Sequence, residues 1–303
     1  VSYKKLYKEL VMYAIPFVFV GLAIPLFQSI DTFMINNVLM NKGYNLGQAE
    51  LINTLVALIQ KIIVIPVALA TAFSVSLVAY VTKAHQGNRV DEIRGHINQS
   101  FKVMMIFVLP STAGMLILSR PIYGSVFGTG YLEQGGTLMA WYAASALFYS
   151  MFSITSAVLQ GLDQQKWVVY SLLIGLVVKV ISNYPLILIF DGEGTAISTY
   201  VGFGVAIIIQ MALIQKVGKY KWSENYVALK NVIKQTLVMT IALIPLGVIS
   251  YFFTSYISQA IILFVGLIVA GIIYCVLAYK NKTLFEVISK VKIDGLLKKL
   301  KLA

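Results

Sequence analysis

The chain has 303 residues, of which 59% are hydrophobic and only 12% are charged, and its mean hydropathy is +0.83. A soluble domain carries roughly 25% charged residues, so the composition excludes an ordinary soluble protein and predicts an all-α integral membrane protein. The formal net charge of +12 does not indicate nucleic-acid binding, because the basic residues lie between apolar stretches rather than on one solvated face.

Eight apolar stretches are long enough to cross a bilayer core of about 30 Å as helices. In chain order, we predict membrane spans over Leu10–Phe33, Leu55–Val81, Val103–Leu118, Leu138–Gln160, Trp167–Phe190, Thr195–Gln215, Gln235–Thr254 and Ala260–Ala278.

The loops between these spans differ in charge from one side to the other. One side holds only Lys42 and Arg120 as basic residues, and it has an acidic turn with Asp191 and Glu193. Apart from Lys61 and Lys179 within the spans, every other Lys and Arg falls on the opposite side. Cytoplasmic loops of membrane proteins are enriched in Lys and Arg, so we expect both ends of the chain in the cytoplasm.

Two cytoplasmic segments are expected to be sizeable. The segment Thr82–Lys102 is mixed in charge and is predicted to lie outside the membrane. The tail Asn281–Leu302 alternates apolar residues with lysines, so we expect it to lie on the inner leaflet and to bind anionic lipids. A solvated basic tail is the alternative.

Asp31, Lys179 and Asn183 form the first candidate site. Lys179 and Asn183 are one helical turn apart, so they share a face of the fifth span. A charge in a membrane helix costs roughly 2.5–3.5 kcal/mol on insertion scales, so it faces a partner or a water-filled cavity. If the fifth span packs on the first, Lys179 neutralises Asp31. Otherwise Asp31 is hydrated at the outer interface and Lys179 pairs with backbone carbonyls.

Lys61, with Gln60 beside it, is the second candidate, near the outer end of the second span. A lysine facing a cavity binds phosphate as a compact charge. The alternative is a lipid-facing lysine whose ammonium reaches the headgroups.

The fourth span supplies the third candidate. Its small hydroxyl residues indicate helix packing, whereas Gln160 and Gly161, at its cytoplasmic end, are candidates for a conformational turn. The glycine-rich segment Tyr123–Gly130 is predicted to be a loop, and it lacks the Lys-Ser or Lys-Thr of a phosphate-binding loop. We find no nucleophile with a base, carboxylate pair or metal-ligand cluster, so we predict neither an enzyme nor a cofactor.

Several local patterns in series resemble the MOP exporter superfamily, in its branch of MurJ-, YtgP- and SpoVB-like flippases for lipid-linked saccharides. They are Ala14-Ile15-Pro16 with Ile30-Asp31-Thr32-Phe33, the run Pro66–Leu77, the turn Leu159-Gln160-Gly161, the run Lys179–Leu186, and Gly192–Thr199. Their order and spacing match over most of the chain.

The resemblance implies that this chain corresponds to helices seven to fourteen of a fourteen-helix flippase. Residues 1–215 would form the second six-helix lobe, 216–278 two further membrane helices and 279–303 the basic tail. The partners implied are a missing N-terminal lobe and a polyprenyl-diphosphate-linked saccharide, such as lipid II, in the bacterial cytoplasmic membrane. We expect this half by itself not to flip lipid.

In lipid II flippases the corresponding region resembles a sodium site, and its positions carry over to Asp31, Asn183 and Thr199. Lys179 departs from that pattern, because a fixed ammonium would compete with a metal cation. This disfavours coupling to sodium and favours a scheme driven by protons or membrane potential, although the sequence names neither the coupling ion nor the cargo. A drug or cation antiporter of the same superfamily and a non-transporting membrane scaffold are the alternative functions.

Overall fold

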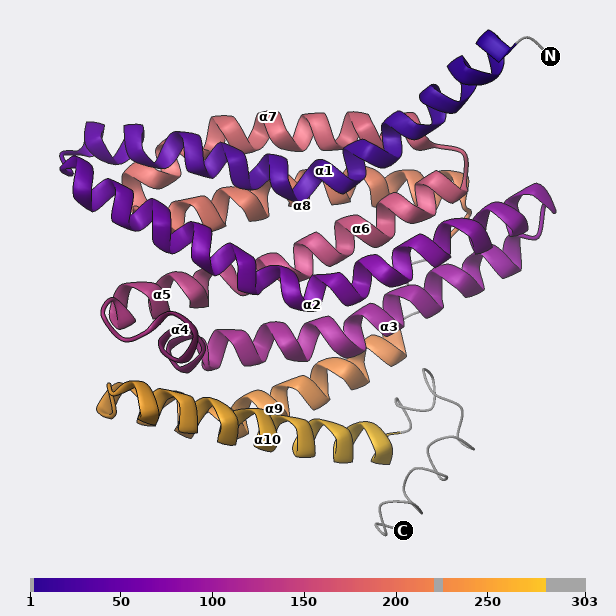
Figure 1. The fold of residues 1–303 in the computed structure, drawn as a ribbon. Helices are drawn as coiled ribbons and strands as arrows, with labels where there is room; N and C mark the ends of the chain where they lie inside the picture. Colours follow the sequence, from indigo (N-terminus) through magenta and orange to yellow (C-terminus); the bar gives the residue numbers. More distant parts are fainter. Residues whose placement is uncertain (1–2, 221–225, 282–303) are drawn as a thin grey trace.

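The computed structural model describes residues 3–220 and 226–281, and this part of the chain is built from helices joined by short connections (Figure 1). The helices are α1 (Tyr3–Lys42), α2 (Leu46–Gln86), α3 (Val90–Ile117), α4 (Ser119–Phe127), α5 (Leu132–Tyr142), α6 (Ser145–Gly161), α7 (Gln165–Phe190), α8 (Glu193–Val217), α9 (Tyr226–Phe252) and α10 (Tyr256–Lys280). Within the described residues, eight segments are long and apolar enough to cross a membrane, with α5 and α6 together forming one of them. The predicted all-α fold and its eight spans are confirmed.

Several helices are longer than the predicted membrane spans, because hydropathy marks only the apolar middle of a helix. The first span was expected to end at Phe33, but α1 continues to Lys42. The second begins at Leu46, where the Asn45 side chain accepts from the Gln48 N–H and the Gln48 side chain accepts from the Asn45 N–H. This capping box fixes the helix start well before the apolar run.

Two predicted non-membrane segments are also helical. Residues 82–102, which are expected in the cytoplasm, form the end of α2 up to Gln86 and the start of α3 from Val90. The predicted loop Tyr123–Gly130 is mostly α4, which ends where Gly128 adopts a positive φ of 87°. Polar helix-forming residues extend the hydrogen-bonded ladder beyond the membrane core. The predicted tail Asn281–Leu302 lies outside the described residues, apart from Asn281.

The helices form an elongated bundle in which α7 and α8 lie on one side and α9 and α10 on the other (Figure 1). Helix α1 packs on α7, α2 packs on α6, and the α9–α10 pair packs on α3 and α4. Helices α7 and α8 approach most closely at two glycines: a Cβ on Gly202 would lie 2.8 Å from the Gly175 carbonyl oxygen. Small residues allow such backbone contact in membrane bundles, and this contact brings Lys179 close to α8.

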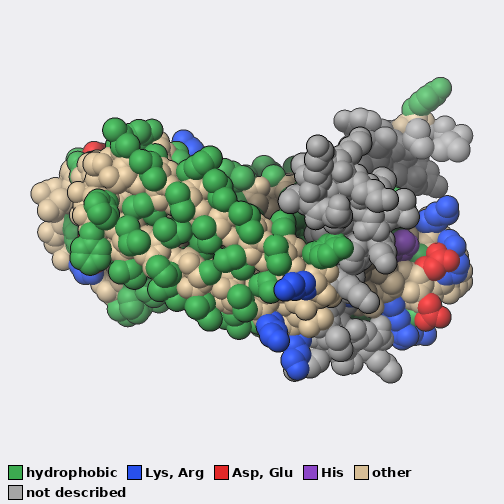
Figure 2. Space-filling model, turned by 90° about the horizontal axis from the view of Figure 1, so that it is seen from below, with side chains coloured by type: hydrophobic (Ala, Val, Ile, Leu, Met, Phe, Trp, Pro, Cys, Tyr) green, Lys and Arg blue, Asp and Glu red, His purple; other side chains and the backbone are tan. Residues whose placement is uncertain are grey.

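The two ends of the bundle differ in charge. We call one end the acidic end; it contains the connections at 43–45, 128–131, 191–192 and 253–255. It carries Glu133, Asp191 and Glu193. Its two basic residues are ion-paired, Lys42 to Asp191 and Arg120 to Glu133. The basic end carries the connections at 87–89, 162–164 and 218–220. Figure 2 shows a hydrophobic surface over most of the bundle and Lys and Arg side chains gathered at one end.

Gly161 closes α6 against α2, and we predict that Gly161→Ala destabilises the fold. The new methyl group would lie 2.6 Å from Cβ of Val81, and such overpacking costs about 1–3 kcal/mol. Gly95→Ala is the control, because nothing lies within 4 Å of its Cβ and alanine favours a helix. Thermal unfolding in detergent should show a lower Tm for Gly161→Ala alone; equal Tm values for both variants would contradict the packing role.

Candidate functional site: a buried ion pair and an exposed lysine

Asp31 of α1 and Lys179 of α7 form an ion pair inside the bundle. Lys179 Nζ lies 2.5 Å from Asp31 Oδ1, and the two side chains are 0% and 2% exposed. The predicted contact between the first and fifth spans is therefore observed, and neither charge faces lipid. A buried charge is tolerated when it is paired and its remaining hydrogen-bonding capacity is met.

Helix α8 completes a shell of oxygen atoms around the Lys179 ammonium. Nζ donates to the Thr195 carbonyl at 3.0 Å, to Ser198 Oγ at 3.0 Å and to Thr199 Oγ1 at 2.7 Å. Asn183, one turn along α7, accepts from Ser198 Oγ at 2.6 Å. An ammonium has three protons, so four surrounding oxygens satisfy it fully.

The other carboxylate oxygen of Asp31 is held by α2 and α5. Gln60 Nε2 donates to Asp31 Oδ2 at 3.1 Å and the Tyr142 hydroxyl donates to it at 3.3 Å. The Tyr142 hydroxyl also lies 2.6 Å from Thr195 Oγ1. The hydrogen-bond partners of Asp31 are therefore linked to those of Lys179. Side chains from α1, α2, α5, α7 and α8 thus join in one buried network.

Sequence reasoning brought Asp31, Lys179, Asn183 and Thr199 together, and the structure places all four in this network. It grouped Gln60 with Lys61, whereas Gln60 is buried and binds Asp31. It missed three members, Tyr142, Thr195 and Ser198. The spacing of Thr195, Ser198 and Thr199 on one face of α8 could have revealed the hydroxyl cluster, but no sequence pattern marks Tyr142.

The network lies deeper in the bundle than the predicted spans implied. Lys179 is 12 residues from Asp191 at the acidic end of α7, which corresponds to about 18 Å along a helix. Lys61 follows Gln60 directly, so it lies near the same level rather than near a helix end. Unlike Gln60 it is exposed, and no hydrogen bond or ion pair involves it in the described part of the chain.

The surface around Lys61 combines small and polar side chains with large apolar ones. On α2, one exposed stripe carries Thr54, Lys61, Ala68, Ala72 and Ala79, with Ile65 and Val75 beside it. Helix α10 exposes mainly large apolar side chains, among them Ile257, Ile261, Phe264, Ile272 and Val276. Small and polar side chains are typical of a helix that contacts protein or water within a membrane.

An apolar cavity of about 570 Å³ lies between α2, α3, α9 and α10. Its lining includes Ile62 and Pro66 of α2, Phe107 and Pro110 of α3, and Gly271 of α10. Ile62 is the neighbour of Lys61, so the cavity begins beside the exposed lysine stripe. The predicted turn residue Gln160 is buried near the basic end, and its Nε2 has no hydrogen-bond partner in the described residues.

We predict that Lys179→Met destabilises the protein strongly. The substitution leaves the Asp31 carboxylate buried without its counter-ion, which costs about 3–5 kcal/mol in buried pairs. Adding Asp31→Asn to Lys179→Met should restore part of the loss, because the two residues interact directly.

Thermal unfolding followed by tryptophan fluorescence tests this prediction, with Lys216→Met, an exposed lysine of α8, as the control. If Lys179→Met unfolds at the same temperature as Lys216→Met, the pair contributes nothing to stability.

Comparison with known proteins identifies the family of this chain. The family model described as lipid II flippase MurJ matches residues 52–268. The lipid II flippase MurJ of Bacillus subtilis is 30% identical over 98% of this chain and 56% of its own length. A probable low-salt glycan biosynthesis flippase, Agl15 of Haloferax volcanii, is 25% identical over 71% of this chain and 44% of its own.

The fold agrees with a solved structure of a lipid II flippase MurJ in an inward closed conformation. The TM-score is 0.64 at 16% identity, over 91% of this chain and 56% of that one. This chain therefore spans about half the length of the relatives it matches. From the extent of the family match and the identity to the Bacillus protein, the chain belongs to the MurJ family of lipid II flippases.

Proposed function

We propose that this chain forms part of a flippase that moves a polyprenyl-diphosphate-linked saccharide across the bacterial cytoplasmic membrane by alternating access. One observation carries the proposal: Lys61 exposes a charge with no partner among the described residues, next to Gln60 of the buried Asp31–Lys179 network and on a stripe that includes small side chains. Lipid does not stabilise such a charge, whereas a water-filled passage shared with a second lobe does.

The charge of Lys61 supports an anionic cargo. A diphosphate carries negative charge, and an ammonium binds phosphate oxygens as a point charge. Lys179 does not serve this purpose, because Asp31 neutralises it and both are buried. A drug or cation exporter would instead need an acidic cavity.

The oxygen shell around Lys179 supports a scheme without sodium. Asp31, Ser198 and Thr199 offer the hard oxygen ligands that a small cation takes, but the ammonium already fills the space between them. In this proposal Lys179 is a tethered cation that joins α1, α7 and α8. Transport is then driven by protons or by membrane potential rather than by sodium.

The apolar cavity beside α2 suits the hydrocarbon part of the cargo. It is lined by apolar side chains of α9 and α10, and those spans carry no charge between Gln235 and Thr254 or between Ala260 and Ala278. The headgroup would contact Lys61 while the polyprenyl tail lies in this cavity. The basic end of the bundle is placed in the cytoplasm, following the positive-inside rule.

We predict that Lys61→Met lowers the transport of lipid-linked saccharide by at least about tenfold without lowering Tm, whereas Lys61→Arg retains most of it. A lost charge-assisted contact of 1.5–3 kcal/mol corresponds to roughly this change. The measurement is flipping of a fluorescent lipid-linked saccharide in proteoliposomes that hold the whole transporter, in sodium and in potassium buffers.

Equal rates for Lys61→Met and the parent protein would favour a membrane scaffold or a different cargo. A requirement for sodium would contradict the tethered-cation scheme. Labelling of Lys61→Cys by an impermeant thiol reagent, in a Cys275→Ala background, separates a wet passage from lipid, because Cys275 is itself exposed.

We also predict that Gly271→Trp blocks transport by filling the apolar cavity. Gly271 lines the cavity and has open space around its Cβ, so the indole enters the cavity without disturbing the packing of the helices. Ile261→Trp, on the outer face of α10, is the matched control. Loss of flipping in Gly271→Trp alone is the expected result; equal flipping by the two variants would exclude this cavity as the tail site.

A further inference from the structure

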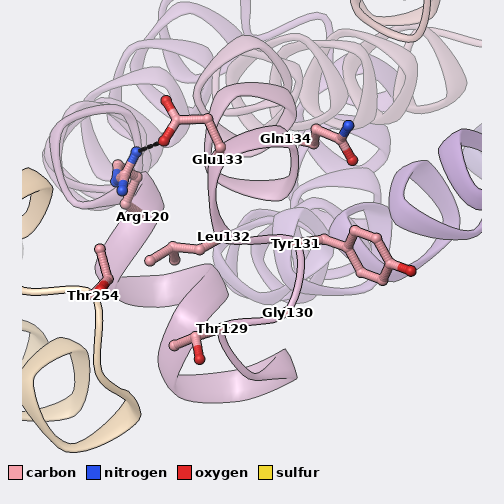
Figure 3. A pocket seen from close by; sticks show the side chains of 8 residues that line it. All are labelled: Arg120, Thr129, Gly130, Tyr131, Leu132, Glu133, Gln134 and Thr254. Carbon is pink, nitrogen blue, oxygen red and sulfur yellow. Dashed lines mark hydrogen bonds and ion pairs between the residues drawn. The ribbon is translucent and has the colours of Figure 1, made fainter.

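A second pocket, separate from the buried ion pair and from the apolar cavity, opens at the acidic end of the bundle. It has a volume of about 480 Å³ and lies where α4, α5 and the α9–α10 connection meet (Figure 3). Its lining is formed by Arg120, Thr129, Gly130, Tyr131, Leu132, Glu133, Gln134 and Thr254. Nothing in the proposed transport mechanism uses this pocket.

Arg120 anchors one side of the pocket. Its side chain is 7% exposed and forms an ion pair with Glu133, whose side chain is 73% exposed. The guanidinium lies 4.1 Å from the centre of the Tyr251 ring of α9, which adds a cation–π contact. Among the described residues, Arg120 Nε has no hydrogen-bond partner although it is buried. Because Nε is buried, only the outer part of the Arg120 side chain borders the pocket.

The net charge of the pocket indicates the chemical class of its ligand. Glu133 neutralises Arg120, and the remaining polar lining consists of the Gln134 amide and the hydroxyls of Thr129 and Thr254. A phosphate in this pocket would meet the Glu133 carboxylate, whereas a hydroxyl group can donate to Glu133 and accept from Arg120 or Gln134. The donors and acceptors therefore fit an uncharged polyhydroxyl compound better than an anion.

The exposed ring of Tyr131 completes this chemistry, beside the buried Leu132. The Tyr131 side chain is 51% exposed, and Leu132 lies between Tyr131 with Gln134 on one side and Arg120 with Thr254 on the other (Figure 3). A sugar ring has hydroxyls at its rim and apolar C–H faces, and tyrosine offers an apolar body next to a polar tip. We propose that this pocket binds an uncharged saccharide at the acidic end of the bundle.

The biological role of such a site, receiving the exported sugar headgroup on the outer side, rests on the proposed function. Binding of a saccharide to the pocket does not depend on the proposed function, so either proposal can fail while the other holds. The test uses saturation-transfer NMR on the protein in lipid nanodiscs, with maltose, cellobiose and diacetylchitobiose as uncharged probes and inorganic pyrophosphate as the anionic probe. We expect at least one disaccharide to bind at concentrations on the order of 10 mM or below, and pyrophosphate not to bind.

Three variants make the test specific. Tyr131→Ala should weaken disaccharide binding roughly two- to tenfold, while Tyr131→Phe should retain it because the ring remains. Tyr170→Ala, which removes an equally exposed tyrosine of α7 near the basic end, should have no effect. Glu133→Gln should make the pocket bind pyrophosphate, because Arg120 then lacks its carboxylate counter-ion. Stronger binding of pyrophosphate than of any disaccharide by the parent protein, or no disaccharide binding at all, would overturn the proposal.

Discussion

The fold depends on the pairing of Asp31 with Lys179. Neither charge can be left alone in a bundle surrounded by hydrocarbon, because the interior offers no water to replace a lost partner. The pair therefore holds α1 against α7, and the hydroxyls and carbonyl of α8 must come close enough to satisfy the ammonium. Glycines at the α7–α8 contact permit that approach.

The charged side chains near the Asp31–Lys179 pair are of two kinds, buried and paired or exposed and unpaired among the described residues. Asp31 and Lys179 satisfy each other, so they add no net charge to the interior. Lys61 lies one residue from Gln60, which belongs to the buried network, yet it points outward without a partner among the described residues. Adjacent positions on a helix point about 100° apart, so one turn of α2 supplies both a structural ligand and an exposed cation.

The α9–α10 pair adds two features that the main bundle lacks. It lines an open apolar cavity together with α2 and α3, and its connection at the acidic end borders a polar pocket beside Arg120. The cavity is suited to hydrocarbon and the pocket to hydroxylated groups. The two sites lie on the same side of the bundle and are joined by α4, whose residues Arg120 and Ile122 each line one of them.

The sequence alone determined the membrane class, the eight spans and the family resemblance, because the hydrocarbon core demands long apolar helices whatever the tertiary packing. It also identified Asp31, Lys179 and Asn183, since polar groups stand out in apolar runs, and the family resemblance added Thr199. Only the tertiary structure decided that Gln60 faces inward, that Tyr142 and Thr195 complete the network, and that polar residues extend α1 and α2 well past the apolar runs. These features depend on helix rotation and on contacts between distant segments, which hydropathy along the chain does not encode.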